Sequence, residues 1–138
     1  MHPDPEEAAF LKAYNIHDYD VPLTTVDLVI FTVRAQRLQV LLVKRGDFPF
    51  KGRWALPGGF IDIRRDADLD ATALRKLREK TGVVAPYVEQ FQGFGGRDRD
   101  PRGWSTTFAY FALIAADTVA PAEGTGVVVY LRQEGRGI

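Results

Sequence analysis

The sequence predicts an α/β protein, and three observations support this. Long runs rich in β-branched and aromatic residues, at 24–35, 38–44 and 105–115, are typical of buried strands. A charged segment at 69–81 has helical character and stops at Gly82, a residue that suits a left-handed helix cap. The chain has 138 residues, 46% of them hydrophobic, which is enough for one domain with a core.

The remaining elements follow in chain order. Residues 5–14 predict a short helix with a proline and two glutamates in its first turn. The strands at 24–35 and 38–44 are separated only by a tight turn, so we expect a hairpin. Residues 86–94 predict a further strand, and the polar loop at 95–103 leads into the strand at 105–115.

Composition limits the class of partner and the compartment. The formal net charge is zero, so the sequence implies no general attraction for nucleic acid, and we expect no nucleic-acid partner. The chain has no cysteine, which removes disulfides and thiolate zinc sites, and we expect no zinc. No apolar run reaches membrane-spanning length and the N-terminus lacks an apolar signal core, so we expect no membrane partner and a cytoplasmic protein.

The stretch from Trp54 to Val83 organises the chain. A short apolar strand runs into Pro57-Gly58-Gly59, and a loop then leads to the helix at 69–81. This order resembles the Nudix box of the nucleoside-diphosphate-X hydrolases. In that family's pattern a glycine is followed six positions on by a glutamate, and later by Arg-Glu-apolar-x-Glu-Glu-x-Gly-apolar. The residues that fit the second half are Arg75, Leu77, Glu79, Gly82 and Val83.

The resemblance breaks at the carboxylates. Lys76 and Lys80 stand where the pattern has glutamates, the loop is two residues longer, and the first glutamate position falls on Ala67. Positions 76, 79 and 80 share one helix face, where three glutamates would hold Mg²⁺. Here the formal charge of that face changes from minus three to plus one, so Mg²⁺ binding is possible but disfavoured.

Glu79 is therefore the one remaining candidate for a catalytic or metal-binding carboxylate, and its alternative role is an ion pair with a lysine or Arg75. We expect Arg75, Lys76 and Lys80 to bind a diphosphate, while a solvated helix face is the alternative for the lysines. The backbone at Gly58 and Gly59 can approach a ligand closely.

The polar loop supplies three further candidates. Arg97 and Arg102 could clamp phosphate, and Trp104 could face an adenine ring. A solvated hairpin loop explains the same residues equally well.

Several other segments, among them TVDLVIFTV and PFKGRWALPGGF, extend the likeness from about Pro5 to Ala116. They resemble the Nudix branch that includes ADP-ribose pyrophosphatases and the Nudix-related regulators of NAD metabolism. The resemblance implies an α/β/α sandwich with a mixed sheet. It also implies ADP-ribose or a related nucleoside diphosphate as ligand, which the regulators sense without cleaving it.

The C-terminal segment brings a second resemblance. Residues 124–138 resemble a fragment of GTP cyclohydrolase II, in which Glu134, Gly135 and Arg136 match phosphate- and metal-contacting residues. Because that family's zinc-binding cysteines are absent, we expect no GTP ring opening. We divide the chain into a Nudix-like domain at 1–121 and a tail at 122–138 that is not a separate folded domain.

The tail stands where a Nudix domain usually has its C-terminal helix. The absence of that helix would expose one face of the sheet. We therefore expect a homodimer that covers this face, with the N-terminal helix as a possible substitute.

Three functions remain open. The first is ligand binding with lost or weak hydrolysis. The second is an active Mg²⁺-dependent Nudix hydrolase that recruits Asp62, Asp66, Asp68 or Asp70; the alternative role for Asp68 and Asp70 is to cap the helix. The third is an inactive remnant of a fusion with GTP cyclohydrolase II.

Overall fold

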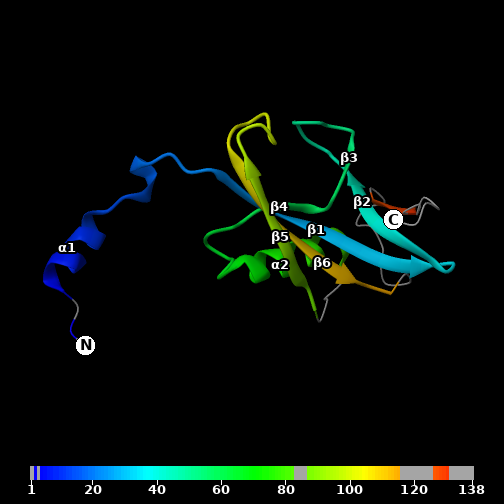
Figure 1. The fold of residues 1–138 in the computed structure, drawn as a ribbon, viewed down its shortest axis with the longest axis horizontal. Coiled ribbons are helices and arrows are strands. Elements are labelled where there is room, and N and C mark those ends of the chain that lie inside the picture. Colours follow the sequence, from blue (N-terminus) through cyan, green and yellow to red (C-terminus); the bar gives the residue numbers. More distant parts are fainter. Residues whose placement is uncertain (1, 3, 83–86, 116–125, 131–138) are drawn as a thin grey trace.

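The fold is built on one mixed sheet (Figure 1). The computed structural model describes residues 2, 4–82, 87–115 and 126–130. In these ranges the sheet has seven strands in the order β3-β2-β1-β6-β5, with β4 paired to β1 and β7 paired to β2. The strands are β1 (Leu23–Arg34), β2 (Arg37–Lys44), β3 (Trp54–Ala55), β4 (Gly58–Phe60), β5 (Glu89–Gly96), β6 (Ser105–Leu113) and β7 (Gly126–Tyr130). The predicted α/β class with a mixed sheet is confirmed.

Strands β1 and β2 form the predicted hairpin. Arg34 pairs with Arg37, so the turn has only two residues, Ala35 and Gln36. Both have positive φ, 50° and 61°, as tight hairpin turns require. The turn therefore forms without the glycine that usually supplies this conformation.

Strand β1 is the centre of the sheet because it pairs in parallel with β6 and antiparallel with β2 and β4. Its alternate residues Val26, Leu28 and Ile30 are buried in the core. Helix α2 (Leu69–Thr81) contributes Ala73 and Leu77 to the same core cluster. One face of β1 thus carries the helix, and the residues between face the other way.

Helix α2 has the bounds that the sequence predicts. The Asp68 carboxylate caps its start by accepting a hydrogen bond from the Ala71 backbone N–H at 2.8 Å. Gly82 ends it in the left-handed conformation with φ 73°.

Helix α1 (Pro5–Ala13) does not cover the sheet. None of its residues is buried, and Figure 1 shows it apart from the sheet, beyond an extended linker that includes the short η1 helix (Ile16–Asp18). Its one aromatic residue, Phe10, instead contacts the segment that follows the helix, since the Phe10 and Tyr14 rings lie 5.6 Å apart and Tyr14 stacks on Tyr19 at 5.3 Å. The expectation that this helix could substitute for a missing cover is therefore wrong.

The C-terminal part contributes one strand. Strand β7 pairs antiparallel with β2, in register from Gln39↔Tyr130 to Val43↔Gly126. Glu134, Gly135 and Arg136 lie outside the described residues. Neither described helix is long and apolar enough to cross a membrane.

Packing of α2 on the sheet is tested by truncating one leucine on each side of the helix. Leu77 is fully buried, whereas Leu74 is 41% exposed. We expect Leu77→Ala to lower the free energy of unfolding by about 2–5 kcal/mol, because it removes core contacts and leaves a cavity. The matched control Leu74→Ala should cost less than about 1 kcal/mol. Urea denaturation measures both, and equal losses would contradict the packing described.

Candidate ligand-binding site

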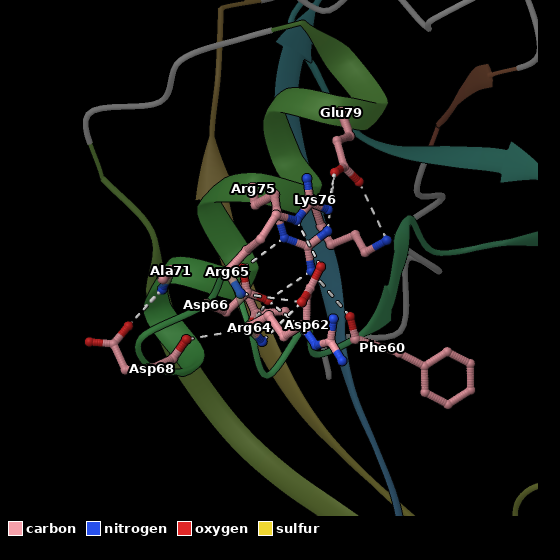
Figure 2. Close-up of polar contacts among 11 residues, drawn as sticks. Phe60, Asp62, Arg64, Arg65, Asp66, Asp68, Ala71, Arg75, Lys76 and Glu79 are labelled. Carbon is pink, nitrogen blue, oxygen red and sulfur yellow. Dashed lines mark hydrogen bonds and ion pairs between the residues drawn. The ribbon is translucent and has the colours of Figure 1, made fainter.

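A buried ion pair joins the loop before α2 to the helix (Figure 2). Arg75 donates from Nε to Asp66 Oδ1 and from Nη2 to Asp66 Oδ2, both at 2.7 Å. The two side chains are only 9% and 4% exposed. Asp66 also accepts from the Asp62 backbone N–H at 2.8 Å and from the Thr72 hydroxyl at 2.9 Å. Asp66 thus anchors the long loop to the first turns of the helix.

The pair fixes the charge of both groups. The hydrogen bond from Arg75 holds the pKa of Asp66 well below its usual range, although burial opposes this shift. The same contact raises the pKa of Arg75 further. Both groups are therefore ionised near neutral pH. The Arg75 guanidinium is engaged on three sides, because it also contacts Glu79 and the Phe60 carbonyl oxygen, the latter at 3.3 Å.

Glu79 is surrounded by cations. Its carboxylate accepts from Arg75 Nη1 at 3.1 Å and lies 3.4 Å from Lys76 Nζ and 3.6 Å from Arg65 Nη2. Burial works to raise the pKa of Glu79, but the hydrogen bond from Arg75 and the charge of Lys76 outweigh it, so the pKa is lowered. A single carboxylate already paired with three cations does not fit the donor set of a Mg²⁺ site.

The acidic residues of the loop are also engaged. Asp62 accepts from Arg65 Nε at 2.7 Å, and this bond is the main reason that its pKa is lowered. Asp68 caps the helix, and Asp70 accepts from the Tyr110 hydroxyl at 2.6 Å. In the described ranges, no three acidic or histidine side chains form a group that could hold a metal ion.

The glycines expected in a turn lie in strand β4 instead, which pairs with β1 and lies against Lys76 of α2. Gly59 has φ 156°, and a Cβ there would lie 2.9 Å from Lys76 Nζ. A Cβ on Gly58 would overlap the Val26 carbonyl oxygen. Glycine is therefore required at position 58 by the backbone of β1 and favoured at position 59 by the positive φ, whereas the end of the Lys76 side chain could move aside.

Beside β4 lies a cleft of about 340 Å³, which we call the cation cleft. Among its lining residues are Gly58, Gly59 and Phe60 of β4. Its charged lining residues are the cations Lys44, Arg45, Lys80, Arg99 and Arg102 and the carboxylates Asp27, Asp47 and Asp100. The formal charge of the lining is therefore positive by two, which favours an anionic ligand.

Two of the cations differ in how free they are to bind a ligand. Lys80 forms no ion pair within the part of the chain that the structure describes, so its ammonium group is available to an anion. Arg102 lies 2.8 Å from Asp100 and 5.0 Å over the Phe60 ring. The hydrogen bond from Arg102 lowers the pKa of Asp100 to about 2.

The structure brings together some of the residues that the sequence singles out and separates others. Gly58, Gly59, Lys80 and Arg102 line the cation cleft, and the Lys76 side chain lies against Gly59 without being among the lining residues. Glu79 and Arg75 are not among the described residues that line it. Arg97 is 83% exposed beside Asp98, and Trp104 lines a neighbouring cavity that shares Arg102 with the cleft.

Asp27, a residue that sequence reasoning missed, lies in the central strand β1 and lines the cation cleft. Its carboxylate accepts from the Thr107 hydroxyl at 2.7 Å and lies 3.9 Å from Arg99 Nη2. The signal was an aspartate in the middle of an otherwise apolar, β-branched strand. Such a charge costs free energy in a sheet centre unless it is paired or serves a ligand.

The mixed sheet, helix α2 packed on it and a cleft with a net positive lining define an α/β domain. The family model described as NUDIX domain matches residues 22–132, and the chain belongs to this family.

Three similar proteins bear on the site. The chain is 55% identical over 108 residues to the ADPR responsive transcriptional repressor NtrR of Acinetobacter baylyi, covering 78% of this chain and 43% of that protein. It is 36% identical over 94 residues to the ADP-ribose pyrophosphatase of Methanocaldococcus jannaschii, covering 67% of this chain and 50% of that protein. The NUDIX domain of Shewanella oneidensis NrtR complexed with ADP ribose superposes with a TM-score of 0.80 at 46% identity, covering 90% of this chain and 81% of that chain. The chain thus spans half or less of the length of the two full-length relatives.

The Asp66–Arg75 pair predicts a pH dependence of stability. Because the pKa of Asp66 is depressed in the folded state, its contribution is fully present above the unfolded value of about 3.9 and is lost as pH falls. We expect Asp66→Asn to lower the urea midpoint at pH 7, with the gap to wild type narrowing towards pH 3. Asp98→Asn, which removes a carboxylate that is 93% exposed, should leave the midpoint at pH 7 nearly unchanged. A gap that stays constant from pH 7 to pH 3 would rule out the ionic pairing.

Proposed function

We propose that this domain binds ADP-ribose or a related nucleoside diphosphate derivative with lost or weak hydrolysis. The observation that carries the proposal is the division of charge around α2. Lys80 faces the cation cleft, whereas Glu79, the carboxylate left in the box, is held by Arg75, Lys76 and Arg65. The cleft offers cations and glycine backbone to a diphosphate. A metal ion that would activate water has too few free oxygen ligands.

Two similarities support the choice of ligand. A similar domain, that of Shewanella oneidensis NrtR, has been crystallised with ADP ribose. The Acinetobacter relative is described as ADPR responsive. Its role as a transcriptional repressor is not carried over, because this chain covers 43% of that protein.

The alternative is an active ADP-ribose pyrophosphatase-like hydrolase using Mg²⁺, and the Methanocaldococcus relative favours it. Against it stands the state of the four loop carboxylates. Asp62, Asp66, Asp68 and Asp70 each already accept a hydrogen bond from a protein group, so recruiting them to a metal would break existing contacts.

Calorimetry with ADP-ribose, with and without Mg²⁺, separates these functions when combined with an assay for AMP and ribose 5-phosphate, the two products of cleaving the diphosphate bond. We expect binding in the absence of Mg²⁺ and little or no turnover in its presence. Lys80→Ala should weaken binding about tenfold or more, because a hydrogen bond to a charged group is worth roughly 1.5–3 kcal/mol. The matched control Lys12→Ala, on α1, removes the same charge far from the cleft and should leave affinity unchanged.

Metal-dependent turnover would replace the proposal with the hydrolase. Absence of both binding and turnover would instead favour the inactive remnant of a fusion with GTP cyclohydrolase II.

The domain is also proposed to form a homodimer. Several apolar side chains are exposed on the sheet and on α1. The exposed fractions include 60% for Phe91, 71% for Leu113 and 62% for Phe10. A second copy would remove this surface from water. Light scattering at micromolar concentration should give twice the monomer mass, and Phe91→Glu should lower it. A monomer mass for the wild-type chain would contradict the dimer.

A further inference from the structure

Two further cavities adjoin the cation cleft, and both lie beside Trp104. One, of about 560 Å³, shares Arg102 with the cleft. Its lining includes Asp20, Val21, Pro22, Leu23 and Trp104. The other, of about 630 Å³, shares Asp27, Leu56 and Arg99 with the cleft. Both cavities are therefore continuous with the cleft. The first is mainly apolar and aromatic but also contains Asp20, and the second contains Asp27.

The cavity that contains Asp27 has a carboxylate oxygen free to accept hydrogen bonds from hydroxyl groups. Asp27 Oδ2 accepts from the Thr107 hydroxyl, and Thr107 also lines this cavity. Asp27 Oδ1 has no hydrogen-bond partner in the described part of the chain, although the side chain is only 30% exposed. A carboxylate oxygen accepts hydrogen bonds and repels phosphate, so it fits a polyol better than it fits a further anion.

Two glycines of β5 leave space in the cavity that contains Asp27. Strand β5 contributes Gly93 and Gly95 to the cavity lining, and side chains there would fill part of the space. A Cβ on Gly93 would lie 3.3 Å from the Phe108 ring, and one on Gly95 would lie 3.2 Å from the Trp104 ring. The cavity is thus open because two consecutive outward positions of the strand lack side chains.

We propose that Asp27 is a specificity-determining residue that accepts hydrogen bonds from the hydroxyls of the sugar attached to the distal phosphate of a nucleoside diphosphate sugar. The assignment rests on the proposed function. The diphosphate occupies the cation cleft, the base lies in the cavity lined by Val21, Pro22 and Trp104, and the sugar reaches Asp27 in the other. Only a ligand with groups on both sides of the diphosphate fills both adjoining cavities, which distinguishes ADP-ribose from ADP.

Calorimetry with ADP-ribose and with ADP, on the wild-type chain and on Asp27→Asn, tests the assignment. The wild-type chain should bind ADP-ribose about tenfold or more tightly than ADP, because charge-assisted hydrogen bonds to the distal ribose are absent with ADP. Asp27→Asn should reduce this ratio towards one. Its affinity for ADP should stay the same or rise, since a negative charge is removed from a phosphate site.

A matched control is available in the same cleft. Asp47 also lines the cation cleft but not the Asp27 cavity, so Asp47→Asn removes the same charge without touching the sugar site. It should leave the ratio of the two affinities unchanged. Urea denaturation of each variant checks that the fold is kept.

The outcomes separate this assignment from the function on which it rests. Equal wild-type affinities for the two ligands, or an unchanged ratio in Asp27→Asn, would overturn the role of Asp27 and leave nucleotide binding intact. A parallel loss of both affinities in Asp27→Asn would overturn it as well, because the residue would then act on the shared part of the ligand. Failure of the wild-type chain to bind either ligand would remove both proposals.

Discussion

The site depends on the burial of one guanidinium group. Arg75 lies under the loop before α2 with its side chain 9% exposed, and a charge placed there must be paired. Asp66 supplies both oxygens of its carboxylate, and it also accepts hydrogen bonds from a backbone N–H and a hydroxyl of its surroundings. This set of contacts determines the path of a loop that is two residues longer than the family pattern. It also engages Asp66 fully in the protein.

The same guanidinium decides what the face of α2 presents to a ligand. Arg75 and Glu79 are separated by four positions, so they meet along the helix and the carboxylate turns towards Arg75. Lys76 lies between Glu79 and Gly59, and Lys80 reaches the cleft without an ion pair in the described structure. Three positions that share one helix face therefore have three different environments. The result is a cation at the cleft and a neutralised carboxylate behind it.

Strand β1 connects this chemistry to the stability of the fold. Residues on one of its faces, such as Val26 and Leu28, pack in the core beneath α2. Asp27 lies between them on the opposite face, where the cleft and the glycine-lined cavity meet. Because side chains alternate along a strand, the same two residues that fix the register of β1 in the core also fix the position of the carboxylate in the site. Core packing and ligand geometry are thus set together.

The sequence indicated a glycine turn where the structure has strand β4, and it left Asp68 open between a helix cap and a metal ligand. By itself it determined strands β1, β2 and β6, the bounds of α2, its cap at Gly82, and the replacement of glutamates by lysines. These are local properties, since periodicity, capping and a motif depend on neighbours within a few residues. Only the tertiary structure decided that Arg75 faces Asp66, that α1 lies away from the sheet, and that Asp27 faces the cleft. Each of these depends on contacts between residues distant in sequence or on the path of a loop or linker, which no local pattern encodes. The sign of each side-chain charge was therefore predictable from the sequence, whereas the direction in which each charged side chain points depended on the tertiary structure.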